Sequence, residues 1–440
     1  MSSDFFIPQA PLSWRMKASV FLFLALLASA AYAPFQGLPL MSDDYLQIDM
    51  SREYGPASGW PRVAVDPLYR SRATSHVLTV WTERLFGLTP AAFHLSSLAV
   101  HIVNVWLVFL LGWWRVIGWR VAAFSAAFFA IQIAPQEAVV WYAAVHELLH
   151  LLFALLTIHC WLRWLHSKRE RYYAASLALL LLALLSKESA VAIAPLLGVL
   201  GLVDGAGWRR IAIRVLPHAL MTLAYMLLIF AAAPAHGHFH DAGTFSFSAP
   251  FWRTWLISQG RLFWIWGLAA LIALAIWRPA GQARLLFLAG SWAGLALLPY
   301  CFLTYMPFVP SRHTYFASAG EALIVGAAFS HFASLYRRKG WAVAALALLI
   351  IGHQWVYLWV WKLPHYRQRA ADTEDLIRFA EHVPGPIYIH CFPVGIQAAE
   401  MALKLRLGKP MVYIGSVPDL SQYRGRNDVY CLNPREHLKD

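Results

Sequence analysis

Long apolar runs separated by short basic clusters constrain this chain more than any other feature of its sequence. An α-helix needs about 20 apolar residues to cross the hydrocarbon core of a bilayer, and runs of about that length recur between residues 17 and 361. Only 13% of the 440 residues are charged, whereas a soluble domain has about 25%. The chain is therefore predicted to be mainly α-helical, as a polytopic bundle of membrane helices.

The apolar runs predict about eleven transmembrane helices. They cover residues 17–34, 93–113, 121–133, 142–164, 172–185, 191–203, 211–233, 262–277, 285–305, 316–335 and 341–361. With this count every basic cluster between spans lies on one side, which the positive-inside rule assigns to the cytoplasm. The net charge of +13 is then a topology signal, and it does not indicate nucleic-acid binding. We expect a multi-pass protein of a bacterial inner (cytoplasmic) membrane, with its N-terminus in the cytoplasm and its first span retained.

Two parts of the chain are predicted to lie outside the bundle, on the periplasmic side. The loop 37–90 is external, and its residues 71–86 are amphipathic in the way of a helix lying in the membrane interface. After residue 364 the sequence becomes polar and alternates between short helical and strand patterns. We therefore predict a transmembrane domain over 1–364 and a small soluble α/β domain over 365–440. Cys391 and Cys431 lie in the latter, and an oxidising periplasm would permit a disulfide there.

A pair of carboxylates opens the external loop. Asp43 and Asp44 are adjacent, and Tyr45 follows them. A positioned carboxylate can act as general base for a hydroxyl nucleophile, and acidic residues are scarce in this chain. We interpret Asp43 as the first candidate for the base and Asp44 as the group that orients donor or acceptor, with the reverse order left open. The alternative is a solvated loop or a helix N-cap.

Cations and supporting polar groups are predicted at the same membrane face. Fixed cations stabilise a phosphate leaving group, and ionisable residues at a membrane edge are functional candidates by default. The candidates for binding a donor phosphate are Arg72, Lys187, Arg312 and His313, and those for support are Tyr45, His94, Glu137 and Glu188. Each residue taken alone could instead be a snorkelling or ion-paired side chain.

The sequence also contains patterns that resemble metal sites. His146-Glu147-Leu148-Leu149-His150 matches the HExxH pattern of zinc peptidases, although no third ligand is identifiable, and a membrane metalloprotease remains an alternative. His94 and His101 share one helix face, where packing or hydrogen bonding is the expected role. His236, His238 and His240 alternate in a Gly-rich loop, which is weak support for zinc. The four cysteines form no CxxC pattern, so no metal is assigned.

Several segments, in order, resemble the GT-C superfamily of polyprenyl-phosphate-dependent membrane glycosyltransferases. The likeness is greatest to the branch of transmembrane O-mannosyltransferases with tetratricopeptide repeats and their bacterial relatives. The matching segments are Asp43-Asp44-Tyr45, Arg72, Phe86–Pro90, Phe93–Leu95 with His101 and Asn104, Pro135–Trp141, Ser186–Ala190 with Pro195, and Ser311–Phe316 with Gly320. Ala73 stands where the family has proline, Arg70 competes with Arg72, and no tetratricopeptide repeats follow.

The resemblance implies a GT-C bundle whose external loop supplies an aspartate base and whose cations at Arg72, Lys187 and Arg312 hold the donor phosphate. The predicted activity is transfer of a sugar from a polyprenyl-phosphate donor to a hydroxyl on a protein, glycan or lipid, with inversion at the anomeric carbon. No cofactor is expected beyond that lipid-linked donor. A transporter or flippase for a lipid-linked sugar is the other alternative, since it too would need cationic cavity residues.

Overall fold

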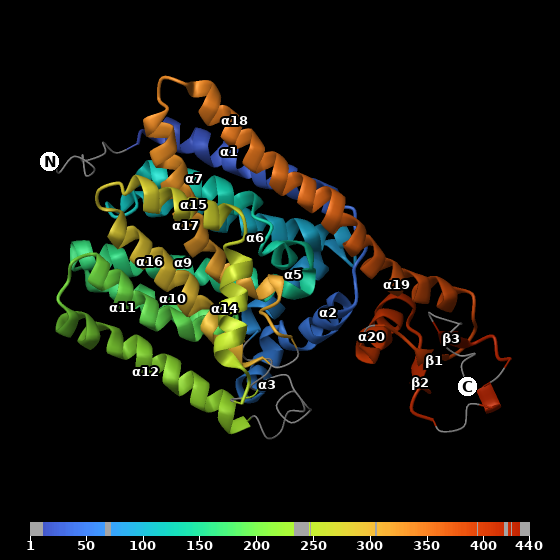
Figure 1. Cartoon of the computed structure of the whole chain (residues 1–440). Helices are drawn as coiled ribbons and strands as arrows, with labels where there is room; N and C mark the ends of the chain where they lie inside the picture. The colour runs from blue at the N-terminus through green and yellow to red at the C-terminus, as the bar shows by residue number, and fades with distance from the viewer. Residues whose placement is uncertain are drawn as a thin grey trace.

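A computed structural model describes residues 12–66, 72–232, 246, 248–303, 306–393, 395–417, 421–423 and 425–431. It is a bundle of helices from which one long helix leads to a small α/β unit beyond one end (Figure 1). The predicted cluster of His236, His238 and His240 and the competing Arg70 lie outside the described residues.

Each predicted span coincides with a helix of the bundle. These helices are α1 (Trp14–Tyr32), α6 (Pro90–Leu110), α7 (Gly118–Ile131), α9 (Val145–Ser167), α10 (Glu170–Leu184), α11 (Ile193–Val203), α12 (Trp208–Ala232), α15 (Trp266–Trp277), α16 (Gln282–Leu297), α17 (Tyr315–Leu335) and α18 (Gly340–Val356). In the described part, seven helical stretches are long and apolar enough to cross a membrane. An eighth candidate is α14 (Phe251–Leu262) with α15, a pair bent by 83°. The fold class is confirmed as a multi-pass helical membrane protein, but a count of eleven spans is not, because α7, α10 and α11 are shorter than a full span.

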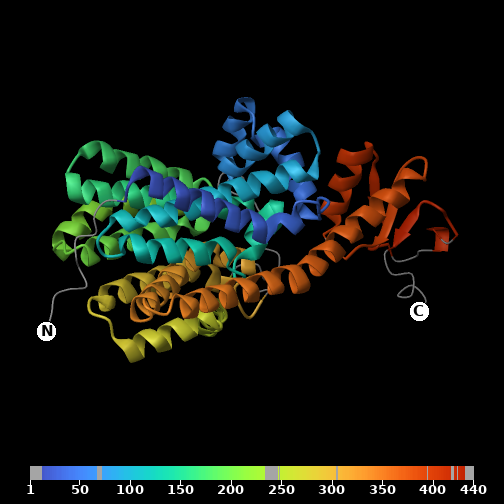
Figure 2. The ribbon, with the colours of Figure 1, turned by 90° about the horizontal axis from the view of Figure 1, so that it is seen from above.

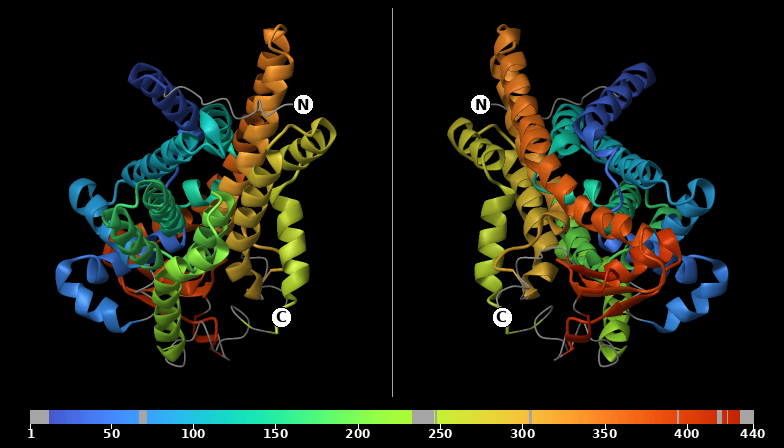
Figure 3. Two further views of the ribbon diagram at one scale, coloured as in Figure 1. Left: turned by 90° about the vertical axis from the view of Figure 1, so that its left-hand side faces the viewer. Right: turned by 90° about the vertical axis from the view of Figure 1, so that its right-hand side faces the viewer.

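Helix α17 forms the centre of the bundle, and small residues allow its neighbours to approach closely. A Cβ on Gly320 would lie 2.6 Å from the Ala289 carbonyl oxygen on α16, and one on Gly326 would lie 2.1 Å from Ser125 Oγ on α7. Small residues serve this purpose between membrane helices, because close packing rather than the hydrophobic effect holds such helices together. Helices α1, α12, α14 and α18 lie at the periphery (Figure 3).

The loop 37–90, which was predicted to be external, is itself helical and packs as a layer at one end of the bundle. It contains α2 (Asp43–Tyr54), α3 (Trp60–Val65) and α5 (Ala73–Phe86), the last at the predicted interfacial helix. Gln47 of α2 donates hydrogen bonds to Ser75 (3.2 Å) and Thr79 (3.3 Å) of α5, so a buried polar network joins the two helices. Figure 2 shows this layer and the C-terminal unit at the end of the bundle away from the N-terminus.

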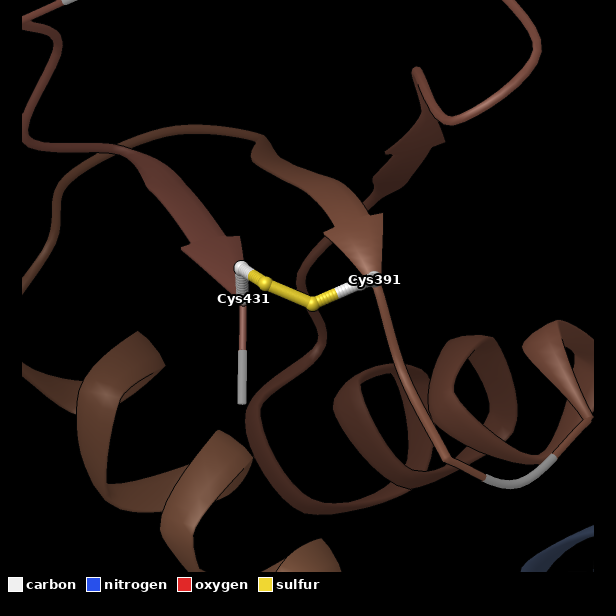
Figure 4. The surroundings of a disulfide bond; sticks show 2 residues. All are labelled: Cys391 and Cys431. Carbon is white, nitrogen blue, oxygen red and sulfur yellow. A yellow bond between two sulfur atoms is a disulfide. The ribbon is translucent and has the colours of Figure 1, made fainter. Parts of the chain in front are cut away.

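The C-terminal unit is a three-stranded parallel sheet covered by two helices. Its elements are α19 (Leu363–Glu381), β1 (Ile387–Cys391), α20 (Ile396–Leu407), β2 (Met411–Tyr413) and β3 (Val429–Cys431), with strand order β2-β1-β3. Leu376 of α19 and Leu403 of α20 pack against Ile389 of β1 in a second hydrophobic core. Cys391 and Cys431 form a disulfide between β1 and β3 (Figure 4). Short helices and strands alternate in this unit, as the sequence pattern after residue 364 predicted.

Helix α19 continues α18 through one π-helical stretch, Tyr357–Lys362, so that residues 340–381 form one helical run. The domain boundary predicted at residue 364 falls in the first turn of α19. The first half of α19 packs beside the bundle, and its second half belongs to the core of the α/β unit. A single rigid element therefore connects the two parts.

Candidate active site

The segment from Gln136 to His150 is the meeting point of the polar groups at this end of the bundle. It contains the short helix α8 (Gln136–Val140), the residues Trp141 to Ala144, and the first turns of α9. Helices α9, α11 and α17 begin near it, and α7, α10 and α16 end near it. Polar residues that follow or precede these helix ends are therefore brought together although they are far apart in the sequence.

Asp44 joins the external loop to this segment. Its Oδ2 accepts a hydrogen bond from the Met41 amide (2.9 Å) and its Oδ1 accepts one from the Ala143 amide (2.7 Å). The side chain is fully buried. Burial raises its pKa to about 7, although both hydrogen bonds and the positive charge of Arg369 oppose that rise. Asp44 thus fixes the start of α2 against the start of α9, which is a structural role.

Asp43 occupies a different environment from its neighbour. It is the first residue of α2 and is only partly buried. Its carboxylate makes no side-chain hydrogen bond to the described part of the chain. Of the two adjacent aspartates, Asp43 is therefore the one with a carboxylate available to accept a proton from a substrate.

Glu147, in the first turn of α9, contacts Lys187, His313 and Tyr300. His313 Nδ1 donates to Glu147 Oε1 (2.5 Å), and Lys187 Nζ lies 3.6 Å from the same oxygen. Tyr300 donates to Glu147 Oε2 (2.8 Å), and the rings of Tyr300 and His313 are stacked. The Glu147 side chain is only 1% exposed. A buried carboxylate requires such compensation, so Glu147 fixes the positions of Lys187 and His313.

A second, more exposed group of charges surrounds Glu137 of α8. Glu137 Oε1 lies 3.2 Å from Arg312 Nη1 and 3.5 Å from Arg369 Nη1. Both guanidinium groups also lie over the Trp141 ring, at 5.0 Å and 3.9 Å from its centre. Stacking on the Trp141 ring and the shared Glu137 carboxylate hold the two arginine side chains in place. Further guanidinium N–H groups remain to bind an anion.

Arg72 and Glu188 approach the buried cluster from the start of α5 and the end of α10. The hydroxyls of Thr74 and Ser186 are 2.7 Å apart, and the Thr74 amide donates to the Leu185 carbonyl (3.2 Å). Glu188 Oε1 lies 3.4 Å from Lys187 Nζ. Arg72 Nε is buried and has no hydrogen-bond partner in the described part of the chain. The predicted cations Arg72 and Lys187 are thus neighbours through the Thr74–Ser186 contact.

Two predicted supporting residues have structural positions. His94 Nε2 donates to the Leu38 carbonyl (3.0 Å), which fixes the start of the external loop on α6. Tyr45 is a fully buried residue of α2. His101, which was expected to pack or hydrogen-bond, contacts the Ala130 carbonyl and Tyr315. These side chains shape the site and do not line it.

Sequence reasoning missed Arg369, Trp141 and Tyr300. Arg369 lies in a polar helix that was assigned to the separate C-terminal domain, so its sequence gives no sign that it reaches the bundle. Trp141 ends the segment Pro135–Trp141 that resembles the family. The available signal was this aromatic residue four positions after Glu137. Tyr300 ends an apolar span, where tyrosine is common in any membrane protein.

The HExxH pattern does not form a metal site in this structure. Lys187 Nζ lies 3.2 Å from His146 Nε2, and an ammonium group at a ligand nitrogen repels a cation. Glu147 is occupied by His313, Tyr300 and Lys187. In the described residues, the atoms of His390, Cys391 and Cys431 also cluster within 4.8 Å, but the two sulfurs are bonded to each other. The geometry therefore disfavours the metalloprotease alternative.

Comparison with solved structures identifies the architecture. ArnT from Cupriavidus metallidurans bound to undecaprenyl phosphate is similar over 92% of this chain and 87% of its own, with a TM-score of 0.57 and 16% identity. The apo state of that protein gives a TM-score of 0.52 and 17% identity, over 91% of this chain and 86% of its own. This chain has the GT-C fold. A GT-C oligosaccharyltransferase from Archaeoglobus fulgidus, in complex with zinc and sulfate, is similar over 89% of this chain and 62% of its own, with a TM-score of 0.51 and 14% identity.

The GT-C likeness predicted from ordered sequence segments is confirmed at the level of the fold. No protein-family model matches the chain, and no curated protein matches its sequence. Within the bundle of this protein, helices α2, α3 and α5, the buried Glu147 cluster and the Glu137–arginine group all lie at one end.

Proposed function

We propose that this protein is an integral membrane glycosyltransferase. It takes a sugar from a polyprenyl-phosphate donor and transfers it to a hydroxyl acceptor at the external face of a bacterial inner membrane. The observation that carries the proposal is the partly exposed carboxylate of Asp43 at the same end of a GT-C bundle as the cations Lys187, Arg312 and Arg369. The solved neighbour ArnT binds undecaprenyl phosphate, which supports a donor of that class.

The proposed reaction is a direct displacement. Asp43 takes the proton of the acceptor hydroxyl while its oxygen attacks the anomeric carbon, and the bond from that carbon to the phosphate oxygen breaks. A phosphodiester with one negative charge becomes a phosphate monoester with two, so the cations bind the product phosphate more strongly than the donor phosphate. Groups that bind developing charge lower the barrier. One displacement inverts the configuration at the anomeric carbon.

Apolar surface between α11 and α12 supports a lipid-linked donor. Two adjoining cavities of about 360 Å³ and 330 Å³ lie between α11 and α12, and Ala219 lines both of them. The second is lined by Val191 and Pro195, a short distance along the chain from Lys187. An isoprenoid chain is the kind of ligand that such apolar surface would accommodate.

Binding and turnover test the proposal separately. Purified protein in lipid nanodiscs is incubated with undecaprenyl phosphate, and binding is measured by native mass spectrometry for the wild type, Lys187→Gln and Arg312→Gln. Loss of one charged hydrogen bond, worth about 1.5–3 kcal/mol, should weaken binding about 10- to 150-fold. The control is Lys339→Gln, because Lys339 precedes α18 at the opposite end of the bundle and is exposed.

Turnover is measured with a panel of undecaprenyl-phosphate sugars as release of undecaprenyl phosphate. Mass spectrometry of surface glycans and glycoproteins from a deletion strain identifies the acceptor and the sugar. Movement of the lipid-linked sugar across the bilayer without its consumption would favour the transporter alternative and overturn the enzyme proposal.

A further inference from the structure

A strained turn contains Asp43 as its third residue. The Asp44 amide donates to the Met41 carbonyl (3.0 Å), which closes a four-residue turn with Ser42 at its second position. Ser42 has φ 45° and ψ −114°, close to the type II′ position that glycine normally occupies. A residue with a Cβ in this region costs about 1–3 kcal/mol and persists only where the surroundings enforce it. The buried Ser42 hydroxyl makes no hydrogen bond in the described part of the chain, so its side chain does not compensate.

Helix α19 supplies a support for this turn. Thr373 Oγ1 accepts a hydrogen bond from the Ser42 amide (3.3 Å), and Thr373 is fully buried. Tyr366 and Arg369 precede Thr373 at spacings that place all three on one helix face. Tyr366 donates to Gln136 Oε1 (2.7 Å), and Arg369 reaches Glu137. One face of α19 therefore contacts both α8, which carries the arginine-binding carboxylate, and the turn that begins α2.

The C-terminal unit contacts α2 at a second place. Lys404 of α20 lies 2.9 Å from Asp49 Oδ1 on α2, and α20 packs along α2. This ion pair is exposed and contributes at most about 1 kcal/mol. The buried contact between Thr373 and Ser42 is the one that can determine the backbone geometry at Asp43.

We propose that α19 is a positioning element of the active site, and that Thr373 keeps the strained Ser42 turn in the conformation that directs the Asp43 carboxylate toward the acceptor. The inference rests on the proposed function, because it assigns Asp43 as the base. It gives the C-terminal part of the chain a role in catalysis: the helix that enters its core also sets the distance between the base and the cations. Displacement by about 1 Å can lower a rate about 100-fold.

The test uses Thr373→Val, which removes the acceptor oxygen at nearly constant volume. Hydrogen–deuterium exchange is followed in the peptide that contains Ser42, and transfer from a polyprenyl-phosphate sugar is measured beside binding of undecaprenyl phosphate. We expect exchange at Ser42 to rise at least roughly 5-fold and kcat to fall roughly 10- to 100-fold, with the affinity for undecaprenyl phosphate unchanged. The matched control is Thr157→Val, since buried Thr157 only donates to the Phe153 carbonyl within α9.

A second variant separates positioning from loss of folding. Glycine adopts positive φ at little cost. Ser42→Gly therefore removes the backbone strain, and the turn should then keep its conformation without the hydrogen bond to Thr373. We expect the double variant Ser42→Gly with Thr373→Val to recover most of the kcat that the single variant loses. Unchanged exchange and turnover in Thr373→Val, or no recovery in the double variant, would overturn the inference. Wild-type protein that turns over none of the donors would overturn the proposed function, whereas the exchange at Ser42 would still decide whether α19 supports the turn.

Discussion

Asp44 Oδ1 accepts a hydrogen bond of 2.7 Å from the amide of Ala143, a residue 99 positions further along the chain. This bond joins the first turn of α2 to the start of α9, where His146 and Glu147 follow. The adjacent residues Asp43 and Asp44 therefore occupy different environments. Asp44 is buried and fixed by two amides, whereas Asp43 is only partly buried, as the proposed base must be.

Replacement of Asp43 by asparagine should abolish sugar transfer and preserve the fold. The amide cannot accept the acceptor proton, and general-base catalysis contributes about 100- to 10,000-fold. Release of undecaprenyl phosphate from a lipid-linked sugar measures the loss, and Tm in detergent checks the fold. Asp49→Asn on the same helix is the control. Wild-type turnover in Asp43→Asn would remove the base assignment.

Replacement of Asp44 by asparagine should lower the thermal stability of the protein, because Asp44 has a structural role. Asparagine has one carbonyl oxygen, so its NH2 group would face one of the two backbone amides that now donate to Asp44. A buried donor left unpaired costs about 1–3 kcal/mol. Thermal unfolding followed by tryptophan fluorescence should show a lower Tm for Asp44→Asn than for Asp43→Asn. Equal Tm values would contradict the structural role given to Asp44.

Lys187 and Glu147 should be energetically coupled. Each is buried and lies 3.6 Å from the other, so removal of one leaves an under-compensated charge. In a double-mutant cycle, the unfolding free energy lost by the double variant Lys187→Gln with Glu147→Gln should be smaller than the sum of the two single losses by about 1–3 kcal/mol. Additive losses would show that the pair does not interact.

The layer of α2 and α5 should become less stable in acid because of His76. Burial, assisted by the charge of Arg72, lowers the pKa of His76 to about 3, while its ordinary value is about 6.5. Between these values the unfolded chain binds a proton that the folded chain does not, so stability rises with pH and is lost as the pH falls from about 6.5. The difference in unfolding free energy between wild type and His76→Gln, measured from pH 7 to pH 4, should change by about 1.4 kcal/mol per pH unit. A difference independent of pH would contradict the lowered pKa.

Loss of the disulfide should destabilise the C-terminal unit. Cys391 and Cys431 are 40 residues apart, and closing a loop of that size contributes about 3–4 kcal/mol in the chain-entropy account. The double variant Cys391→Ala with Cys431→Ala should be cleaved faster in limited proteolysis within residues 387–431. Cys160→Ala, which changes a free cysteine of the bundle, is the control. If cleavage is equally slow in both variants, the bond adds no stability.

Apolar patterning sufficed to predict the bundle and the sites of its helices. Each predicted span coincides with a helix because a run of apolar residues long enough to enter a bilayer must satisfy its backbone hydrogen bonds internally. The number of true spans did not follow, because α7, α10 and α11 are short and α14 bends into α15 by 83°. Length alone does not tell a span from a short helix buried among others.

The candidate residues near α8 and α9 could be named from sequence because charges between apolar runs are rare. Their partners could not. Arg369 acts more than 200 residues from Glu137, and Thr373 supports Ser42 across 331 positions. Such pairings depend on how α19 crosses the end of the bundle, which no local pattern encodes.

The sequence by itself determined a membrane helix bundle, helix α5 of the loop 37–90 and a polar α/β appendage, since these depend on hydrophobicity and periodicity within short windows. Only the tertiary structure decided that Asp44 is buried between two backbone amides, that Glu147 contacts Lys187 and His313, and that α19 contacts both α8 and the turn that begins α2. The physical reason is that burial and hydrogen-bond partners are properties of packed neighbours, and those neighbours come from distant parts of the chain.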